Sequence, residues 1–185
     1  MKNRLCGNEM DRMPDVAFRM MQFFFRITDL FVTLDKKLDA FGIREGFTVV
    51  DYGCGPGRYI RKASALAGSQ GKVYAVDIHE LALKAVDRVV TKQSLSNVTT
   101  ALTDGKKVAL PDNIADLIYA LDMFHMVRVP NDFLSELARI CKPGGTLILE
   151  DGHQPRKKAR EKVQNSGRWE IISENRQHMV CKVRK

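Results

Sequence analysis

Hydrophobic and polar positions change their period along the chain, and the changes predict its elements. From residue 47 onward, short apolar runs alternate with stripes of apolar residues at helical spacing. The runs predict strands at 47–52, 72–77, 97–102, 115–120 and 145–150, and the stripes predict helices at 57–67, 80–94 and 130–141. Such alternation is typical of right-handed βαβ units around a parallel sheet.

The two ends of the chain follow different patterns. Residues 1–46 are predicted to be helical, with one apolar stripe formed by Val16, Met20, Phe24 and Ile27 and another by Leu30, Leu34, Leu38 and Phe41. Near the C-terminus, a predicted helix at 155–166 precedes two apolar runs, 169–172 and 179–183, which are joined by a short polar turn. These two runs predict an antiparallel hairpin.

The most informative stretch joins the first of the alternating strands to its helix, and it reads Val49-Val50-Asp51-Tyr52-Gly53-Cys54-Gly55-Pro56-Gly57. Glycines at alternate positions permit positive φ and a close approach of a ligand to the backbone. The spacing differs from the G-x-G-x-x-G dinucleotide motif, and no Gly-Lys-Ser/Thr of a P-loop follows. An acid two residues before the first glycine suits a cationic ligand, whereas it would repel a phosphate. A purely structural strand-to-helix turn is the alternative interpretation.

With these residues the sequence resembles the class I S-adenosylmethionine-dependent methyltransferases, whose first motif reads acid-x-G-x-G-x-G. Asp51, Gly53, Gly55 and Gly57 match that motif position for position, and the phrase at 142–145, Lys-Pro-Gly-Gly, is also found in the family. The resemblance implies an α/β, Rossmann-like three-layer sandwich with a mostly parallel seven-stranded sheet and a C-terminal antiparallel hairpin. It covers residues 31–185 as the methyltransferase domain. Residues 1–30 remain as a helical extension, for which a lid and a dimer contact are both open interpretations.

The resemblance further implies S-adenosylmethionine as the cofactor. An acid at the end of the first strand would recognise the methionine ammonium, and the glycine turn would cradle the methionine. Asp77, at the end of the second strand, would hold the ribose hydroxyls, with Ile78 against the adenine. Asp104 and Gly105 would meet the adenine edge, although an ordinary Asp-Gly turn explains them equally. The predicted cofactor-binding residues are Asp51, Tyr52, Gly53, Cys54, Gly55, Gly57, Asp77, Ile78, Asp104, Gly105 and Leu121.

The segment after the fourth strand, 121–125, faces the methyl group in the resembling family. It lacks the prolines of the Asn/Asp-Pro-Pro-Tyr motif found in methyltransferases that act on adenine or glutamine nitrogens. Phe124 and His125 instead match small-molecule enzymes of the ubiquinone/menaquinone-biosynthesis-like group. His125 is the predicted catalytic residue, because neutral imidazole can accept a proton near neutral pH. A passive pocket histidine is the alternative, and alignment with exclusion of water can drive transfer without a base.

Composition limits the number of domains, the class of protein and its expected location. The chain of 185 residues fits one domain, and no run of 18 apolar residues predicts a membrane span. The acidic N-terminus is not typical of a signal peptide. The four cysteines at 6, 54, 141 and 181 form no C-x-x-C pair, so neither zinc nor redox chemistry is indicated and a cytoplasmic location is expected.

Charge leaves a second class of function open. The chain carries a formal net charge of +8, and residues 151–185 contain ten Lys or Arg against four Asp or Glu. A basic C-terminal face suits an RNA- or protein-directed methyltransferase, or a cofactor-binding module. Aromatic residues do not interleave with this charge except at Trp169, which makes a nucleic-acid partner the less favoured alternative. The favoured prediction is a methyltransferase acting on a small-molecule acceptor, with a homodimer through the N-terminal segment left open.

Overall fold

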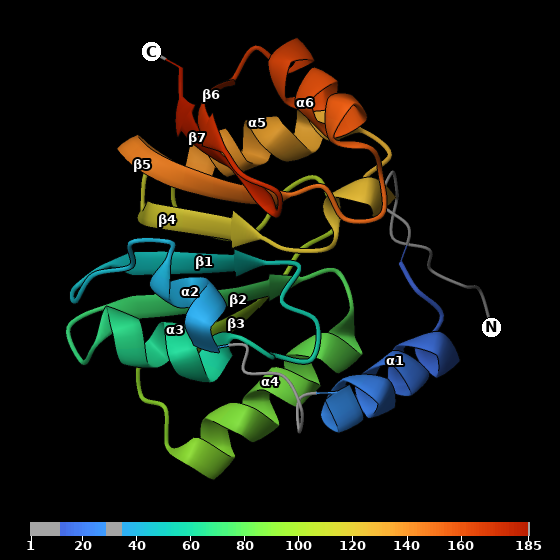
Figure 1. Ribbon diagram of the computed structural model, residues 1–185. Helices are drawn as coiled ribbons and strands as arrows, with labels where there is room; N and C mark the ends of the chain where they lie inside the picture. The colour runs from blue at the N-terminus through green and yellow to red at the C-terminus, as the bar shows by residue number, and fades with distance from the viewer. Residues whose placement is uncertain (1–11, 29–34, 185) are drawn as a thin grey trace.

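The computed structural model describes residues 12–28 and 35–184, which form a seven-stranded sheet in the order β3-β2-β1-β4-β5-β7-β6 (Figure 1). The strands are β1 (Thr48–Tyr52), β2 (Lys72–Asp77), β3 (Val98–Leu102), β4 (Ala115–Ala120), β5 (Cys141–Glu150), β6 (Trp169–Glu174) and β7 (His178–Val183). Strands β1 to β5 pair in parallel, and β7 pairs antiparallel with both β5 and β6. The predicted α/β fold with a C-terminal hairpin is confirmed.

Helices cover both faces of the sheet (Figure 1). On one face lie α2 (Asp35–Asp39), α3 (Ile60–Ala67) and α4 (Glu80–Gln93), and on the other lie α5 (Pro130–Ile140) and α6 (Arg156–Asn165). Strand alternation divides the buried residues between two cores: Val49 packs with Ile60 of α3, whereas its neighbour Val50 belongs to the core that contains Leu137 of α5. The parallel strands are therefore buried on both faces, as their continuous apolar runs predict.

Two element boundaries differ from the sequence prediction for identifiable reasons. Helix α3 begins at Ile60 rather than at residue 57, because Gly57 has a φ of +84° that a right-handed helix excludes. Strand β5 begins at Cys141, which pairs with Ala115, but the next pair joins Thr146 to Leu117. The intervening residues 142–145 form an irregularity inside the strand rather than a turn in front of it.

Helix α1 (Asp15–Thr28) lies beyond the carboxyl ends of the parallel strands (Figure 1). Phe18 is its anchor: the ring is 3% exposed, and its centroid lies 4.4 Å from that of His79, which follows β2. A second contact places the Arg58 guanidinium 4.1 Å from the centroid of the Phe25 ring. Helix α1 is thus attached to the loops after β1 and β2.

The apolar stripe predicted for this helix does not face the protein. Its members, Val16, Met20, Phe24 and Ile27, are all exposed to solvent, and the packed side is formed by Phe18, Met21 and Phe25 instead. The helix is apolar on two sides, so spacing alone did not identify the packed one. In the second predicted stripe, Leu38 and Phe41 are buried, whereas Leu30, Leu34 and the proposed domain boundary at residue 30 lie outside the described residues.

A buried ion pair fixes the segment that follows β3. Glu136 of α5 accepts a hydrogen bond from the Val108 amide at 2.8 Å and is held by Arg139, whose guanidinium also donates to the carbonyls of Val108 and Leu110. This arrangement satisfies backbone groups that a loop would otherwise leave unpaired. Within residues 12–28 and 35–184, no helix has both the length and the apolar character that a membrane crossing requires.

Candidate active site

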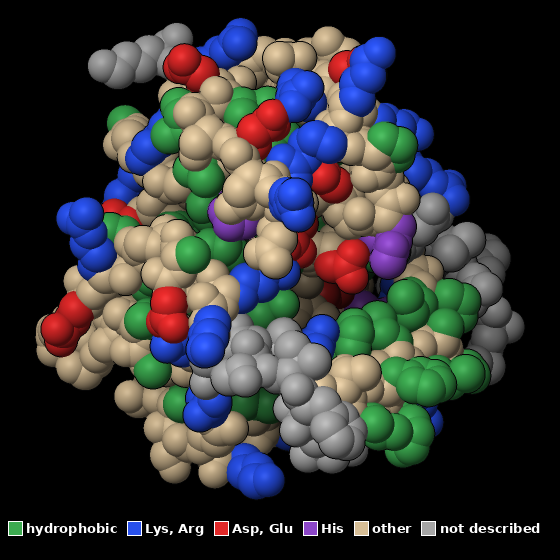
Figure 2. All heavy atoms as spheres, viewed as in Figure 1, with side chains coloured by type: hydrophobic (Ala, Val, Ile, Leu, Met, Phe, Trp, Pro, Cys, Tyr) green, Lys and Arg blue, Asp and Glu red, His purple; other side chains and the backbone are tan. Residues whose placement is uncertain are grey.

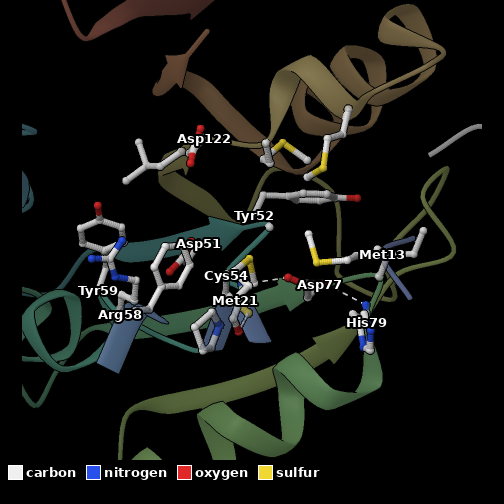
Figure 3. A pocket seen from close by; sticks show the side chains of 18 of the residues that line it. Met13, Met21, Asp51, Tyr52, Cys54, Arg58, Tyr59, Asp77, His79 and Asp122 are labelled. Atoms are coloured by element: carbon white, nitrogen blue, oxygen red, sulfur yellow. Dashed lines mark hydrogen bonds between the residues drawn. The ribbon is translucent and has the colours of Figure 1, made fainter. Parts of the chain in front are cut away.

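A cavity of about 460 Å³ opens at the carboxyl ends of the parallel strands, between the glycine turn and α1 (Figure 3). Ligands of open parallel sheets bind at this edge. Eight of the predicted cofactor residues line the cavity: Asp51, Tyr52, Gly53, Cys54, Gly55, Asp77, Ile78 and Leu121. Gly57, Asp104, Gly105 and His125 are not part of its lining.

Asp51 is a buried carboxylate with one unpartnered oxygen. It is 2% exposed, and within the described part of the chain its Oδ2 atom has no hydrogen-bond partner. Burial raises the pKa of Asp51 to about 8, the nearby Tyr119 hydroxyl lowers this pKa, and the charge of Asp77 adds to the rise. A cationic group in the cavity would favour the ionised carboxylate and offset the free-energy cost of burying its charge. Asp51 therefore selects for a cation.

Asp77 is also buried, but its oxygens are already engaged. Its Oδ2 atom accepts a hydrogen bond from the Gly55 amide at 2.8 Å, and its Oδ1 atom accepts one from the His79 amide at 2.8 Å (Figure 3). Burial raises the pKa of Asp77, and the two amide hydrogen bonds oppose this rise. Each carboxylate oxygen has a further lone pair, so Asp77 can still accept hydrogen bonds from ligand hydroxyls.

The three motif glycines have different physical roles. Gly55 has a φ of +51°, and a Cβ atom built on it meets no atom within 4 Å, so its backbone borders open space at the cavity. A Cβ on Gly53 would lie 2.8 Å from Cγ of Met123. A Cβ on Gly57 would lie 3.0 Å from Cγ2 of Val86 in α4. The third glycine therefore permits close packing of the turn on α4, and its predicted role as a cofactor contact stays a prediction.

Thr103, which the sequence analysis missed, lines the cavity where Asp104 was expected. Its hydroxyl lies 3.1 Å from the Tyr52 hydroxyl and accepts a hydrogen bond from the Gly105 amide at 3.1 Å. Asp104 is exposed and accepts hydrogen bonds from the amides of Lys106 and Lys107, which lower the pKa of its carboxyl. This is the geometry of the turn-forming alternative, and the adenine contact by Asp104 and Gly105 stays a prediction.

A second part of the cavity lining, called here the apolar wall, consists mostly of apolar side chains. Helix α1 contributes Phe18, Met21 and Phe25, and the loop after β4 contributes Leu121 and Met123. The spacing of the three α1 residues, i, i+3 and i+7, was the signal in the sequence that could have identified them. The cavity lining also contains the ion pair of Lys37 and Glu150, whose Nζ and Oε1 atoms lie 2.5 Å apart.

His125 lies in the short 3-10 turn η1 (Phe124–Met126), outside the cavity lining. Its ring packs so closely on Gly152 that a Cβ there would overlap the Nδ1 atom, and its centroid is 4.8 Å from that of His153. Burial lowers the pKa of His125. The neighbouring Asp122, not predicted as a site residue, does line the cavity and has a φ of +53°. The geometry gives the predicted base no direct access to the cavity.

Comparison with known proteins identifies the family. A family described as "Methyltransferase domain" matches residues 50–149, which is more than half of the chain. The chain belongs to the methyltransferase family. The ubiquinone/menaquinone biosynthesis C-methyltransferase UbiE of Ectopseudomonas mendocina is 32% identical over 115 residues, 62% of this chain and 45% of that protein. The UbiE of Teredinibacter turnerae is 32% identical over 123 residues, 66% of this chain and 49% of that protein.

A solved structure extends the similarity over nearly the whole methyltransferase fold. The crystal structure of a SAM-dependent methyltransferase from Aquifex aeolicus superposes with a TM-score of 0.75 and 26% identity, covering 93% of this chain and 98% of that one. The predicted resemblance to the UbiE-like group and its S-adenosylmethionine cofactor are confirmed at the level of the family. The chain spans about half the length of the curated relatives it matches.

The residues of the cavity fit this cofactor. S-adenosylmethionine carries an ammonium, two ribose hydroxyls and an adenine. The unpartnered Oδ2 atom of Asp51 offers an acceptor to the ammonium, and Asp77 offers acceptors to the hydroxyls. The open space beside Gly55 leaves the backbone accessible to the methionine. Asp51, Gly53, Gly55 and Asp77 are therefore the residues that would hold the cofactor.

Cofactor affinity should depend on pH through Asp51. Because the pKa of Asp51 is about 8 in the free protein, this carboxyl is mostly protonated at pH 7, and binding of an ammonium should release its proton. We expect the affinity for S-adenosylmethionine to rise between pH 6 and about 7.5, below the range in which an α-amino group itself loses its proton. Calorimetry in two buffers of different ionisation enthalpy measures the proton release.

The matched variants are Asp51→Asn and Asp132→Asn, the latter at an exposed position of α5. Asp51→Asn should bind the cofactor weakly and without proton release, because the amide has no proton to lose in this range. Asp132→Asn should retain the wild-type pH dependence. Equal proton release in the wild type and in Asp51→Asn would contradict the assignment of the ammonium to Asp51.

Gly55→Val should abolish cofactor binding while the protein remains folded. The side chain would enter the open space beside the turn, and the positive φ would add strain. Gly144→Val is the matched control, since Gly144 also has a positive φ, of +81°, and open surroundings but does not line the cavity. Thermal unfolding should show similar destabilisation of both variants, and calorimetry should show a loss of cofactor binding in Gly55→Val alone. Loss of binding in both would assign the effect to strain.

Proposed function

We propose that the protein transfers a methyl group from S-adenosylmethionine to a small, largely apolar acceptor. The observation that carries this proposal is that one cavity has two unlike sets of lining residues. One set comprises the buried acids Asp51 and Asp77, and the other, the apolar wall, comprises Phe18, Met21 and Phe25 of α1. The acids suit the cofactor, and the apolar wall suits an acceptor that leaves water on binding.

The protein's part in this reaction is binding, alignment and exclusion of water. When bound, S-adenosylmethionine supplies a methyl group that is already activated by a sulfonium. Asp51 would hold the ammonium, Asp77 would accept hydrogen bonds from the ribose hydroxyls, and the glycine turn would hold the methionine. Leu121 and Met123 border the acceptor side of the cavity. Alignment of two reactants in a closed site contributes a large share of the rate in such transfers.

Helix α1 acts as the lid of the acceptor side. Its inner side chains close the cavity, and its attachment to the body rests on contacts with His79 and Arg58. A helix that closes a ligand cavity is suited to move and admit an acceptor. In this proposal, residues 15–28 of the N-terminal extension form the lid, and a dimer contact is the alternative.

The acceptor class follows from the apolar wall together with the similarity to the UbiE proteins. Their name describes C-methylation in ubiquinone and menaquinone biosynthesis. A flat, apolar ring of the quinol class would satisfy the Phe and Met side chains of the wall. We further propose a cytoplasmic location, supported by the buried and unpaired thiols of Cys54, Cys141 and Cys181 among the described residues.

An RNA- or protein-directed activity has weaker support. The charge excess of residues 151–185 is partly engaged within the fold, since Arg156 pairs with Asp151 and Arg160 pairs with Glu174. Lys182 donates to the Gly144 carbonyl and the Thr146 hydroxyl. The basic C-terminal segment is therefore in part a structural network rather than a free binding face.

A screen of acceptors for formation of S-adenosylhomocysteine tests the proposal. Quinols with short apolar tails should support turnover, and small polar amines, RNA oligonucleotides and basic peptides should not. Phe25→Ser should raise the KM for the quinol by about tenfold or more, because it removes an aromatic contact from the apolar wall. Its cofactor affinity should change far less. Turnover with a polar amine or RNA and none with quinols would overturn the proposed acceptor class.

The role of His125 is decided by kinetics. Because its ring packs on Gly152 outside the cavity, we expect His125→Ala to lower turnover by less than about tenfold and to leave any rise of the rate with pH in place. His153→Ala, at the exposed partner ring, is the matched control. If His125 is the base, its loss should lower kcat by roughly 100-fold or more and remove the pH limb that an imidazole produces.

A further inference from the structure

The outward side of α1 carries an apolar surface that no described segment covers. Five large side chains there are between 42% and 72% exposed: Val16, Met20, Phe23, Phe24 and Ile27. At 100° per residue these positions fall within one continuous arc of the helix, opposite the arc that packs on the protein. Figure 2 shows hydrophobic side chains gathered over this helix. Monomeric soluble proteins seldom present contiguous apolar surface of this kind without a partner.

A basic groove borders one flank of this apolar surface. The groove has a volume of about 540 Å³ and runs between α1 and α4, with Gln22 and Phe25 on its α1 side. Its lining contains four cationic side chains, Arg58, Arg61, Arg88 and Lys92, and no Asp or Glu. On the helical wheel, two exposed charged residues lie between Gln22 and the apolar arc: Asp15, and then Arg19 at the edge of the arc.

The other flank of the apolar surface leads to the active site. Beyond Phe24 the wheel passes through Ala17 to Met21, which lines the catalytic cavity. The same helix therefore presents, in order, a basic groove, an apolar surface and the wall of the acceptor cavity. An apolar acceptor that reaches α1 from outside the protein would enter the cavity along Met21 and Phe25.

We propose that α1 and the basic groove dock on the surface of an anionic phospholipid bilayer, with the apolar arc in the acyl region and the cations against the headgroups. An interfacial helix combines apolar residues on one face with Lys and Arg at its border, and it lies on the membrane without crossing it. One consequence rests on the proposed function: the methyl acceptor is a lipophile that enters the cavity from the bilayer.

Two other occupants fit the surface less well. A symmetric contact between two copies of α1 would bury the apolar arcs but would give the cations of the basic groove no anionic partner. A nucleic acid would explain the cations and the phenyl rings, but it leaves the aliphatic side chains of Val16, Met20 and Ile27 in water. An anionic bilayer satisfies both parts of the surface.

Sedimentation with vesicles tests the docking surface on the full chain. Vesicles of phosphatidylcholine with phosphatidylglycerol should bind the protein, and vesicles of phosphatidylcholine alone should bind it at least about tenfold more weakly. Phe23→Ser/Phe24→Ser and Arg88→Glu/Lys92→Glu should each reduce binding to the anionic vesicles by about tenfold or more. None of these four residues contributes to the lining of the catalytic cavity.

Matched controls remove an exposed apolar residue and two exposed cations elsewhere: Ile172→Ser in β6 and Lys157→Glu/Lys158→Glu in α6. Both controls should bind anionic vesicles like the wild type. Absence of vesicle binding, equal binding to neutral vesicles, or equal loss in the controls would overturn the proposal. So would a dimer that the Phe23→Ser/Phe24→Ser variant dissociates in light scattering, or RNA binding at this surface without vesicle binding.

Calorimetry of S-adenosylmethionine binding, without vesicles, separates this inference from the proposed function. All four variants should bind the cofactor with wild-type affinity. If cofactor binding and quinol turnover are intact while anionic vesicles do not bind, only the docking surface is wrong. If anionic vesicles bind as expected while no apolar acceptor is methylated, the proposed function fails and the delivery of a lipophilic acceptor fails with it.

Discussion

The hydrogen bond from the Gly55 amide to Asp77 joins the two strand ends on which the rest of the cavity depends. It fixes the turn after β1 against the end of β2 at 2.8 Å, and it engages one oxygen of a buried carboxylate. Asp51, directly beneath the turn, has no comparable compensation at Oδ2, and the charge of Asp77 raises its pKa further. The folded protein therefore holds two acids in a poorly solvated site, where each would gain from positive charge or hydroxyl donors. A ligand that brings an ammonium and a ribose relieves this cost, so the fold favours such a ligand by its own electrostatics.

Helix α1 depends on that strand edge for its position and gives the site its second character. It is held by a ring contact to His79 and a cation–π contact from Arg58. These two residues belong to the loops that follow β2 and β1. Its inner arc closes the cavity, and its outer arc remains apolar and exposed. A helix with apolar residues on two opposite sides needs a partner for each side. The protein body satisfies one, and the basic groove beside the helix indicates an anionic surface for the other.

The sequence predicted the sheet and the cofactor end of the site because both rest on local signals. Strands β2 and β4 have the predicted bounds, since short apolar runs between turn residues specify them within a few positions. Asp51 was identified by the glycine motif and Asp77 by its place at the end of a strand, and strand ends converge in a parallel sheet. Gly57 shows the limit of the motif: its spacing is that of a ligand contact, whereas its surroundings are Val86 and Ile60 of the packed helices. Nothing in the local sequence distinguishes these two uses of a glycine.

The acceptor end could not be predicted because its residues meet only through tertiary structure. Phe18 and Phe25 lie far in sequence from Leu121 and Met123, and the orientation of α1 decides which of its two apolar sides enters the cavity. His125 was predicted as the base because the segment 121–125 resembles that of small-molecule methyltransferases, and the structure places its ring against Gly152 through a short 3-10 turn. The cofactor end is thus built from strand termini inside a rigid sheet, and the acceptor end from a helix and a loop with few attachments. We therefore expect substitutions in α1 to change the acceptor without moving Asp51 or Asp77, so that specificity would depend on this helix.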